Sequence, residues 1–246
     1  LIDGARLARG RVTRYPHGDV AALANALAVS TAARKLIVTD SVFSMDGDIA
    51  PLRELLALAE AHDALLVVDD AHGFGTLGET GAGAGQEQGV QDQIDLYFST
   101  FAKSMASIGA FIAGDADVIL FLRYNMRSQI FAKSLPMLLV EGALKRLELI
   151  RTQPQLKDNL WKIVHALRKG LHENGFSTGK SNSPVTPVVL NGTVGEAAAL
   201  SMDLRENYGI FCSMVVYPVI PKGMIILRLI PTAVHTQEDV NYTIES

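Results

Sequence analysis

Short apolar runs alternate with helical patterns along the first half of the chain. Residues 35–40 and 64–68 are apolar runs bounded by polar residues, which is typical of buried parallel strands. Between these runs, leucines recur at helical spacing behind Pro51, which is predicted to occupy the first position of a helix. Strand, helix and strand in this order predict an α/β fold with a mostly parallel sheet flanked by helices.

The pattern continues to the C-terminus and divides the chain in two. Asp19 is predicted to cap a helix that begins at Val20. Further helices are predicted at 117–127, 137–150, 155–174 and 194–208, strands at 94–98, 111–114, 187–190, 210–216 and 225–229, and loops at 73–89 and 129–136. Because helix and strand alternate with a shorter period after Pro154, a larger domain is predicted at 1–145 and a smaller α+β domain at 146–246.

Composition and charge narrow the class of protein. The chain has 246 residues, 48% of them hydrophobic, and a formal net charge of -4, so nothing indicates nucleic-acid binding. No apolar run reaches the length of a transmembrane segment. Cys212 is the single cysteine, which excludes a disulfide within the chain and favours a reducing, cytoplasmic setting. No signal peptide is visible, and because the chain opens on Leu1 without an initiator methionine, we expect its N-terminal part to be missing.

One lysine, Lys103, stands among small and apolar residues in the stretch 99–110, just after the predicted strand 94–98. Burial disfavours the charged form of a lysine, and an amine whose pKa is depressed in this way forms Schiff bases readily. Taken by itself, the stretch is explained more simply by a lysine whose ammonium group reaches the surface.

Other chemistry-bearing residues fall at the carboxyl ends of the predicted parallel strands, where ligands bind in open sheets. Asp69 and His72 follow one strand, Ser44 follows another, and Thr100 lies just before the lysine. A lysine that faces an aspartate across a crevice fits pyridoxal phosphate chemistry, which needs an amine for the cofactor aldehyde, an acid for the pyridinium nitrogen and donors for the phosphate. Taken singly, Asp69 is also explained as a helix cap and His72 as a hydrogen-bonded histidine. Together with Lys103 they favour a cofactor site.

Two other kinds of site find little support. The histidines are scattered, and neither an H-E-x-x-H nor a C-x-x-C pattern is present, so no metal site is expected. Asp46 and Asp48 lack the spacing of a calcium loop. The glycine-rich stretch 73–85 fails the dinucleotide fingerprint, because Gln86 stands at the sixth position counted from Gly81. A nucleotide-binding oxidoreductase is therefore a distant alternative.

Several ordered motifs resemble the α-oxoamine synthases, which are fold-type I enzymes that use pyridoxal 5′-phosphate. The resemblance runs over the whole chain, with motifs at residues 39–48, 67–72, 78–83, 100–104 and 228–236. Within that family, the lysine segment 100–109 is most similar to the bacterial serine palmitoyltransferase branch. The resemblance implies that residues 1–145 are the C-terminal portion of a cofactor-binding large domain.

The resemblance also implies a role for each residue at the strand ends. Lys103 would hold the cofactor aldehyde and then act as the catalytic base, and Asp69 would pair with the pyridinium nitrogen. His72, counted with Lys103 as catalytic, would share the phenolic oxygen of the ring with Ser44. Thr100 would contact the phosphate.

Two more distant residues complete the implied site. Arg228 would bind the substrate carboxylate, for which a guanidinium is suited, although a strand-edge arginine in a surface ion pair is the alternative explanation. Ser134 would reach the phosphate held by the partner subunit, because Ala132 stands where the family often carries a small hydroxyl residue. The family's cofactor-stacking histidine precedes the segment that matches residues 2–4, so we expect an incomplete enzyme.

The implied reaction is a decarboxylating condensation of L-serine with a long-chain acyl-CoA, which gives 3-oxosphinganine for sphingolipid biosynthesis. The nearest alternatives are glycine C-acetyltransferase chemistry and the 8-amino-7-oxononanoate synthase type of condensation. A non-catalytic partner subunit is an alternative of a different class, although such subunits usually lack the lysine. The resemblance further implies a homodimer with a shared active site, and peripheral membrane contact is left open.

Overall fold

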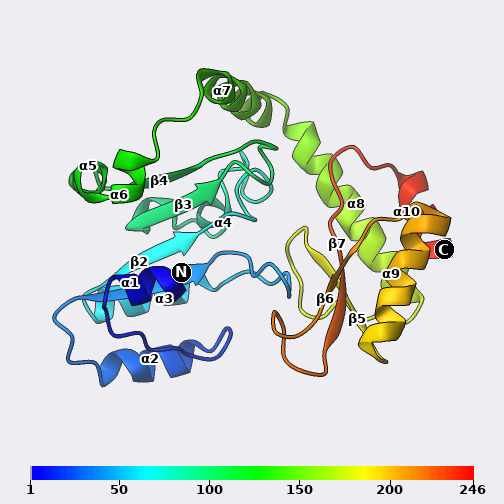
Figure 1. Cartoon of the computed structure of the whole chain (residues 1–246), viewed down its shortest axis with the longest axis horizontal. Helices are drawn as coiled ribbons and strands as arrows, with labels where there is room; N and C mark the ends of the chain where they lie inside the picture. The colour runs from blue at the N-terminus through cyan, green and yellow to red at the C-terminus, as the bar shows by residue number, and fades with distance from the viewer. Residues whose placement is uncertain (1) are drawn as a thin grey trace.

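The computed structural model describes residues 2–246, so that Leu1 lies outside the described part (Figure 1). Four strands form the first sheet in the order β1-β2-β3-β4: β1 (Lys35–Asp40), β2 (Ala64–Asp69), β3 (Leu96–Thr100) and β4 (Ala110–Gly114). The first three strands are parallel and β4 is antiparallel to β3. The predicted α/β fold with a mostly parallel sheet is therefore confirmed.

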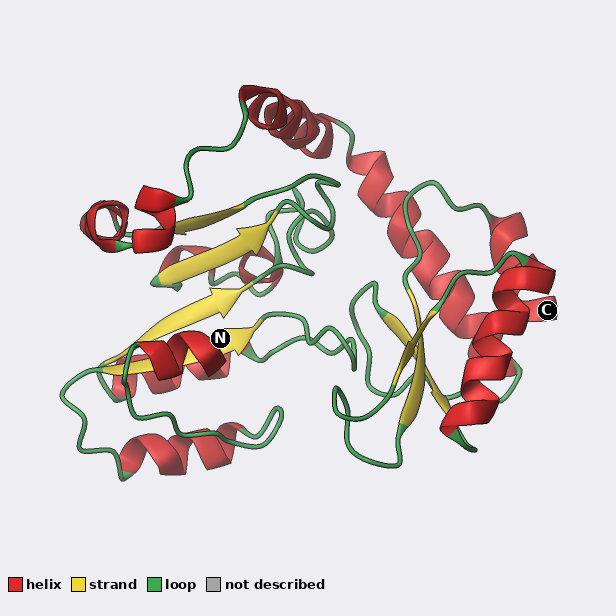
Figure 2. Cartoon of the chain, in the orientation of Figure 1, coloured by secondary structure: helices red, strands yellow, loops and turns green. Residues whose placement is uncertain are grey.

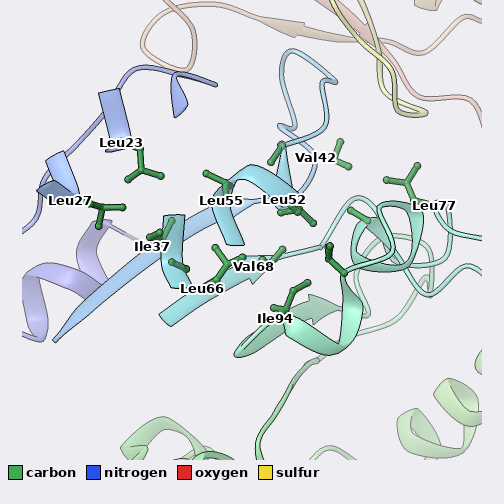
Figure 3. Packing of buried hydrophobic residues seen from close by; sticks show 14 of the residues in the cluster. Leu23, Leu27, Ile37, Val42, Leu52, Leu55, Leu66, Val68, Leu77 and Ile94 are labelled. Carbon is green, nitrogen blue, oxygen red and sulfur yellow. The ribbon is translucent and has the colours of Figure 1, made fainter. Parts of the chain in front are cut away.

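Two helices cover one face of this sheet and form the main core with it (Figure 3). Helix α2 (Val20–Ala28) contributes Leu23 and Leu27, and helix α3 (Leu52–Ala61) contributes Leu52 and Leu55. They pack against the strand side chains that point the same way, which include Ile37, Leu66 and Val68. Because side chains alternate between the two faces of a strand, every second residue is buried there.

The alternate residues of the same strands lie on the opposite face, which is open. Leu36 is 58% exposed, Val38 39% and Leu65 45%. The same alternation places Asp40 and Asp69, the last residues of β1 and β2, on this open face. The candidate site therefore lies at the carboxyl edge of an exposed apolar surface.

A second sheet and four helices follow. Strands β5 (Thr186–Leu190), β7 (Ile225–Leu229) and β6 (Ser213–Val215) form an antiparallel sheet in that order (Figure 2). The helices are α7 (Met137–Thr152), α8 (Pro154–Glu173), α9 (Val194–Tyr208) and α10 (Gln237–Glu245). The apolar side of α8 packs on this sheet and on α10. The predicted domain division near residue 145 stays a prediction, and that position falls within α7.

Some boundaries differ from the predicted ones. Asp19 caps α2 as predicted, its carboxylate accepting from the amide of Ala22, but Pro51 occupies the cap position of α3 rather than its first turn. The predicted loop at 129–136 begins inside a short helix, α6 (Arg127–Phe131), which follows α5 (Ala116–Asn125). The short α1 (Ile2–Leu7) and the terminal α10 were not predicted, and β6 is shorter than expected.

Among the helices of residues 2–246, none combines the length and the apolar character needed to cross a bilayer.

The glycine-rich stretch forms a series of turns that ends in α4 (Ala84–Glu87), followed by the 3-10 turn η1 (Gln91–Gln93). Gly75 lies at φ +81°, and a Cβ there would meet the side chain of Ser104 at 2.7 Å. Glycine is therefore required where this loop packs against the lysine-bearing turn.

Asp70, one residue beyond β2, joins three separate segments inside the core. It is 0% exposed, and its carboxylate accepts from the Ser41 hydroxyl, from the Ala84 amide at 2.9 Å and from the Tyr97 hydroxyl at 2.7 Å. A Cβ at Gly83 would collide with this carboxylate. Burial raises the pKa of Asp70, and the hydrogen bonds from Ser41, Tyr97 and Ala84 oppose that rise.

Replacing Asp70 with alanine should destabilise the fold strongly. The Ser41 hydroxyl and the Ala84 amide would lose their buried acceptor, and each unsatisfied buried donor costs about 1–3 kcal/mol. We expect Asp70→Ala to lower the free energy of unfolding by about 3 kcal/mol, measured by urea titration. Asp92→Ala, at an exposed carboxylate on η1, is the control and should stay within about 0.5 kcal/mol. Equal midpoints for the two variants would contradict the structural role of Asp70.

Candidate active site

The carboxyl edge of the parallel strands brings together residues that are far apart in the sequence. Asp69 ends β2, and one of its carboxylate oxygens accepts from the amide of Ala71 at 3.1 Å. In the strand register Asp69 stands beside Asp40 of β1. Ser44 lies in the loop that leaves the same end of β1, and Thr100 ends β3. Asp69, Ser44 and Thr100 therefore share this edge of the sheet, as expected from the order of elements.

Lys103 lies in a tight turn between β3 and β4. The turn is held by hydrogen bonds from the Phe101 amide to the Gly109 carbonyl at 2.9 Å and from the Ser107 amide to the Phe101 carbonyl at 2.7 Å. Lys103 itself is exposed, which agrees with the simpler explanation of this stretch and not with a buried amine. The structure thus places an exposed Lys103 in a hydrogen-bonded turn.

The positive charges of Lys103 and Arg228, which are far apart in the sequence, both act on His72. Burial lowers the pKa of His72, the positive charges of Lys103 and Arg228 lower it further, and together they bring it to about 4. Both charges therefore act on the imidazole, although 31 and 156 residues separate them from it in the sequence. At neutral pH this histidine is uncharged and can accept or donate a hydrogen bond.

Arg228 reaches this group from β7 in the second sheet. Its Nη1 donates to the main-chain carbonyl of Ser44 at 2.8 Å, which ties the second sheet to the loop after β1. Its Nε is buried without a hydrogen-bond partner among the described residues. A half-buried guanidinium with an unused donor is suited to an incoming carboxylate, and the structure shows no surface ion pair for Arg228 among residues 2–246.

Two predicted site residues are placed differently. The Thr100 hydroxyl donates to the Gly109 carbonyl at 3.1 Å and accepts from the Ala102 amide at 3.1 Å, so it shapes the lysine turn. A phosphate contact by this hydroxyl would take the proton now donated to Gly109. Ser134 lies exposed in the segment between α6 and α7, and no described hydrogen bond joins it to the strand edge. Its expected contact with a partner subunit stays a prediction.

Two carboxylates at the strand ends were not singled out from the sequence. Asp70 is the structural hub described above, and Asp40 stands beside Asp69 on the open face. The rule that selected Asp69, a polar residue at the carboxyl end of a parallel strand, also selects Asp40. Asp70 could not be recognised in this way, because its partners come from the loop after β1, from β3 and from the glycine-rich loop.

Although no metal site was expected, the structure brings three ligand-type side chains together elsewhere. Atoms of His17, Asp46 and Asp48 lie within 4.8 Å of one another, beside a cavity of about 220 Å³. The imidazole Nε2 of His17 is 2.8 Å from a carboxylate oxygen of Asp48, and Phe43 packs edge-on against the ring at 4.2 Å. These contacts fasten the segment before α2 to the loop after β1, and Lys103 does not line the cavity.

The chain matches known proteins along its whole length. The family model described as "Aminotransferase class I and II" covers residues 1–246. The chain belongs to this family. It is 54% identical over 252 residues to a cysteate-C-fatty acyltransferase of Capnocytophaga ochracea and 39% identical over 246 residues to a serine palmitoyltransferase of Sphingobacterium spiritivorum, with 100% of the chain covered in both cases. A solved serine palmitoyltransferase from Sphingomonas wittichii superposes with a TM-score of 0.95 at 32% identity over 99% of the chain.

These matches confirm the resemblance to the α-oxoamine synthases, since 8-amino-7-oxononanoate synthases also match at up to 45% identity. The chain spans about 60% of the length of these relatives and 61% of the solved structure. The expected cofactor, pyridoxal phosphate, is confirmed for the family, and one of the matching structures is described as serine palmitoyltransferase with that cofactor. The amino-acid substrate is not fixed by the comparisons, because the relatives named for cysteate and serine differ in it.

The donor set of this edge fits pyridoxal phosphate. Lys103 offers an exposed amine for the aldehyde, and Asp69 offers a half-buried carboxylate whose second oxygen has no described hydrogen bond. The uncharged His72 offers a nitrogen for a phenolic oxygen, and Arg228 offers a guanidinium for a carboxylate. Amine, acid and oxygen contacts are the groups that this cofactor requires.

The depressed pKa of His72 has a measurable consequence. The folded-state pKa of about 4 lies below the ordinary value of 6.5. Between pH 6.5 and pH 4, the unfolded chain therefore binds a proton at His72 that the folded protein does not bind. Neutral His72 therefore makes its full contribution to the free energy of unfolding above pH 6.5. We expect this contribution to fall progressively as the pH decreases to 4. Urea unfolding at pH 7 and pH 5 should show a smaller difference for His72→Gln than for the wild type.

A second histidine provides the control. His165→Gln removes an exposed imidazole on α8, outside the candidate site, and should leave the pH dependence of stability as it is in the wild type. NMR of the His72 ring would report its protonation directly. A ring that titrates near pH 6.5 would contradict the burial of His72 and the effect of the two cations on it.

Proposed function

We propose that the chain carries the reacting centre of a pyridoxal phosphate-dependent acyltransferase of the α-oxoamine synthase type. The whole protein would condense the α-carbon of an amino acid with the acyl group of a long-chain acyl-CoA, releasing carbon dioxide and coenzyme A. The observation that carries the proposal is that the charges of Lys103 and Arg228 both act on His72, which follows Asp69 at the carboxyl end of β2. When bound, pyridoxal phosphate supplies the electron sink that makes the α-carbon of the amino acid acidic.

Each side chain has a definite task in this proposal. Lys103 would hold the cofactor aldehyde through its amine and would serve as the base for the α-proton of the amino acid. Asp69 would keep the pyridinium nitrogen protonated, while the uncharged His72 and the Ser44 hydroxyl would contact the phenolic oxygen. Arg228 binds the amino-acid carboxylate.

The amino acid is the open part of the assignment. The 54% identity to a cysteate-C-fatty acyltransferase favours L-cysteate, and the lysine segment 100–109 favours L-serine as the second candidate, with 3-oxosphinganine as its product. The two substrates share the ammonium and carboxylate groups that Lys103 and Arg228 would address. They differ in carrying a sulfonate or a hydroxyl at Cβ.

A homodimer with a shared active site is part of the proposal. Helices α5, α6 and α7 expose a series of large apolar side chains: Leu120, Phe121, Tyr124, Ile130, Phe131, Met137 and Leu138. Exposed apolar surface of this extent is typical of an interface between subunits. Thr100 would contact the phosphate of its own subunit and Ser134 that of the partner subunit.

Lys103→Ala tests the cofactor assignment. The whole protein supplied with pyridoxal phosphate should show a visible absorption band, and Lys103→Ala should lose both this band and turnover, since no other amine replaces the one that binds the aldehyde. Lys133→Ala, at an exposed lysine in the segment after α6, should keep the band. A Lys103→Ala protein that retains the band and its turnover would overturn the proposal.

Substrate competition decides the amino acid. Purified protein should be given palmitoyl-CoA with equal concentrations of L-cysteate, L-serine, L-alanine and glycine, and the products analysed by mass spectrometry. We expect the sulfonated ketone from cysteate to dominate. Dominant 3-oxosphinganine would instead assign serine, whereas a product from alanine or glycine alone would contradict both candidates.

Arg228→Lys tests the carboxylate contact. A lysine cannot form the paired hydrogen bonds that a guanidinium makes with a carboxylate, so the KM for the amino acid should rise about tenfold or more, while the KM for acyl-CoA stays nearly unchanged. Arg205→Lys, at an exposed arginine on α9 paired with Glu206, should change neither constant. An unchanged amino-acid KM in Arg228→Lys would place the carboxylate elsewhere.

A further inference from the structure

Asp40 stands at the candidate site without a structural task. It is the last residue of β1 and pairs in the parallel register with Asp69, the last residue of β2. Residues paired in this way project from the same face of a sheet, so both carboxyl groups lie on the open face. Phe98 of β3 pairs with Asp69, and Thr100 follows it by two positions. Because side chains alternate along a strand, Thr100 projects from the same open face.

A comparison with Asp70 shows what distinguishes Asp40. Asp70 points to the covered face, is 0% exposed, and accepts from a hydroxyl, an amide and a phenol. Asp40 is half-buried, and its carboxylate accepts no hydrogen bond from residues 2–246. A half-buried carboxylate with free lone pairs is costly to keep unless a charge or a ligand uses it.

Of the described residues, two charged groups act on Asp40. Burial raises the pKa of the Asp40 carboxyl, the adjacent charge of Asp69 raises it further, and the positive charge of Lys103 from the turn after β3 lowers it. Among the described residues, Lys103 is thus the cation whose charge opposes the rise. Asp69 is the group expected to be engaged by the cofactor ring, which leaves Asp40 as the carboxylate free to face the lysine nitrogen.

We propose that Asp40 is a positioning residue of this site, whose carboxylate stabilises positive charge on the Lys103 nitrogen and thereby sets the pH range in which bound pyridoxal phosphate keeps its visible band. The inference rests on the proposed function. It assigns the Asp40 carboxylate to the Lys103 nitrogen, in addition to the Asp69 carboxylate that is proposed to face the cofactor ring.

The test is a pH titration of the visible band in the whole protein loaded with pyridoxal phosphate. Removing the carboxylate in Asp40→Asn makes the protonated nitrogen less stable, so the midpoint of the band should move about one pH unit lower. Asp40→Glu keeps the charge and should restore the midpoint. Asp63→Asn, which removes a carboxylate in the turn at the opposite end of β2, should leave it unchanged.

The outcomes separate the inference from the proposed function. If the wild type shows no visible band, the proposed function fails and the inference fails with it. If the wild type shows the band but Asp40→Asn titrates at the same midpoint, only the inference is overturned. Loss of the band in Asp40→Asn alone, with a wild-type midpoint in Asp40→Glu, supports it, whereas loss in both variants overturns it because a carboxylate is then insufficient.

Discussion

The buried carboxylate of Asp70 is the interaction on which the rest of the structure depends. It fixes the loop after β1 through Ser41, the next strand through Tyr97 and the glycine-rich loop through Ala84. These segments carry or adjoin every candidate site residue of the larger sheet. Because strand side chains alternate, the neighbouring Asp69 points to the open face. Of these two successive aspartates, Asp70 therefore stabilises the fold and Asp69 faces the candidate site.

The C-terminal part of the chain also positions the site, because donors on β7, on α8 and on the segment before β5 bind main-chain carbonyls of the first sheet's loops. Arg228 donates to Ser44, the indole of Trp161 donates to Thr76 at 2.8 Å, and the amides of Asn182 and Ser183 donate to Gly47 at 3.2 and 3.1 Å. All three acceptors lie on loops that leave the carboxyl ends of β1 or β2. A displacement of the second sheet would therefore move these loops, including the one that carries Ser44.

The sequence allowed the strands, most helices and the edge residues to be predicted, since their signals are local. Apolar runs located β1 and β2, and the positions after them led to Asp69 and His72. The exposure of Lys103 agrees with the simpler explanation of its stretch, whereas the hydrogen bonds that close the turn between β3 and β4 were not predictable from local patterns. The function of Asp70 depends on partners 14 to 29 residues away, and the contact of Arg228 with Ser44 spans 184 residues. Local patterns carry no information on such contacts.

The open face of the first sheet links the burial of apolar surface to the chemistry at its edge. Leu36, Val38 and Leu65 lie on the same face as Asp40 and Asp69, in the same strands. Whatever packs on these apolar side chains extends directly towards the two carboxylates and lowers the local dielectric around them. A contact that excludes water from these apolar side chains would therefore also strengthen the electrostatic interactions between the carboxylates and Lys103.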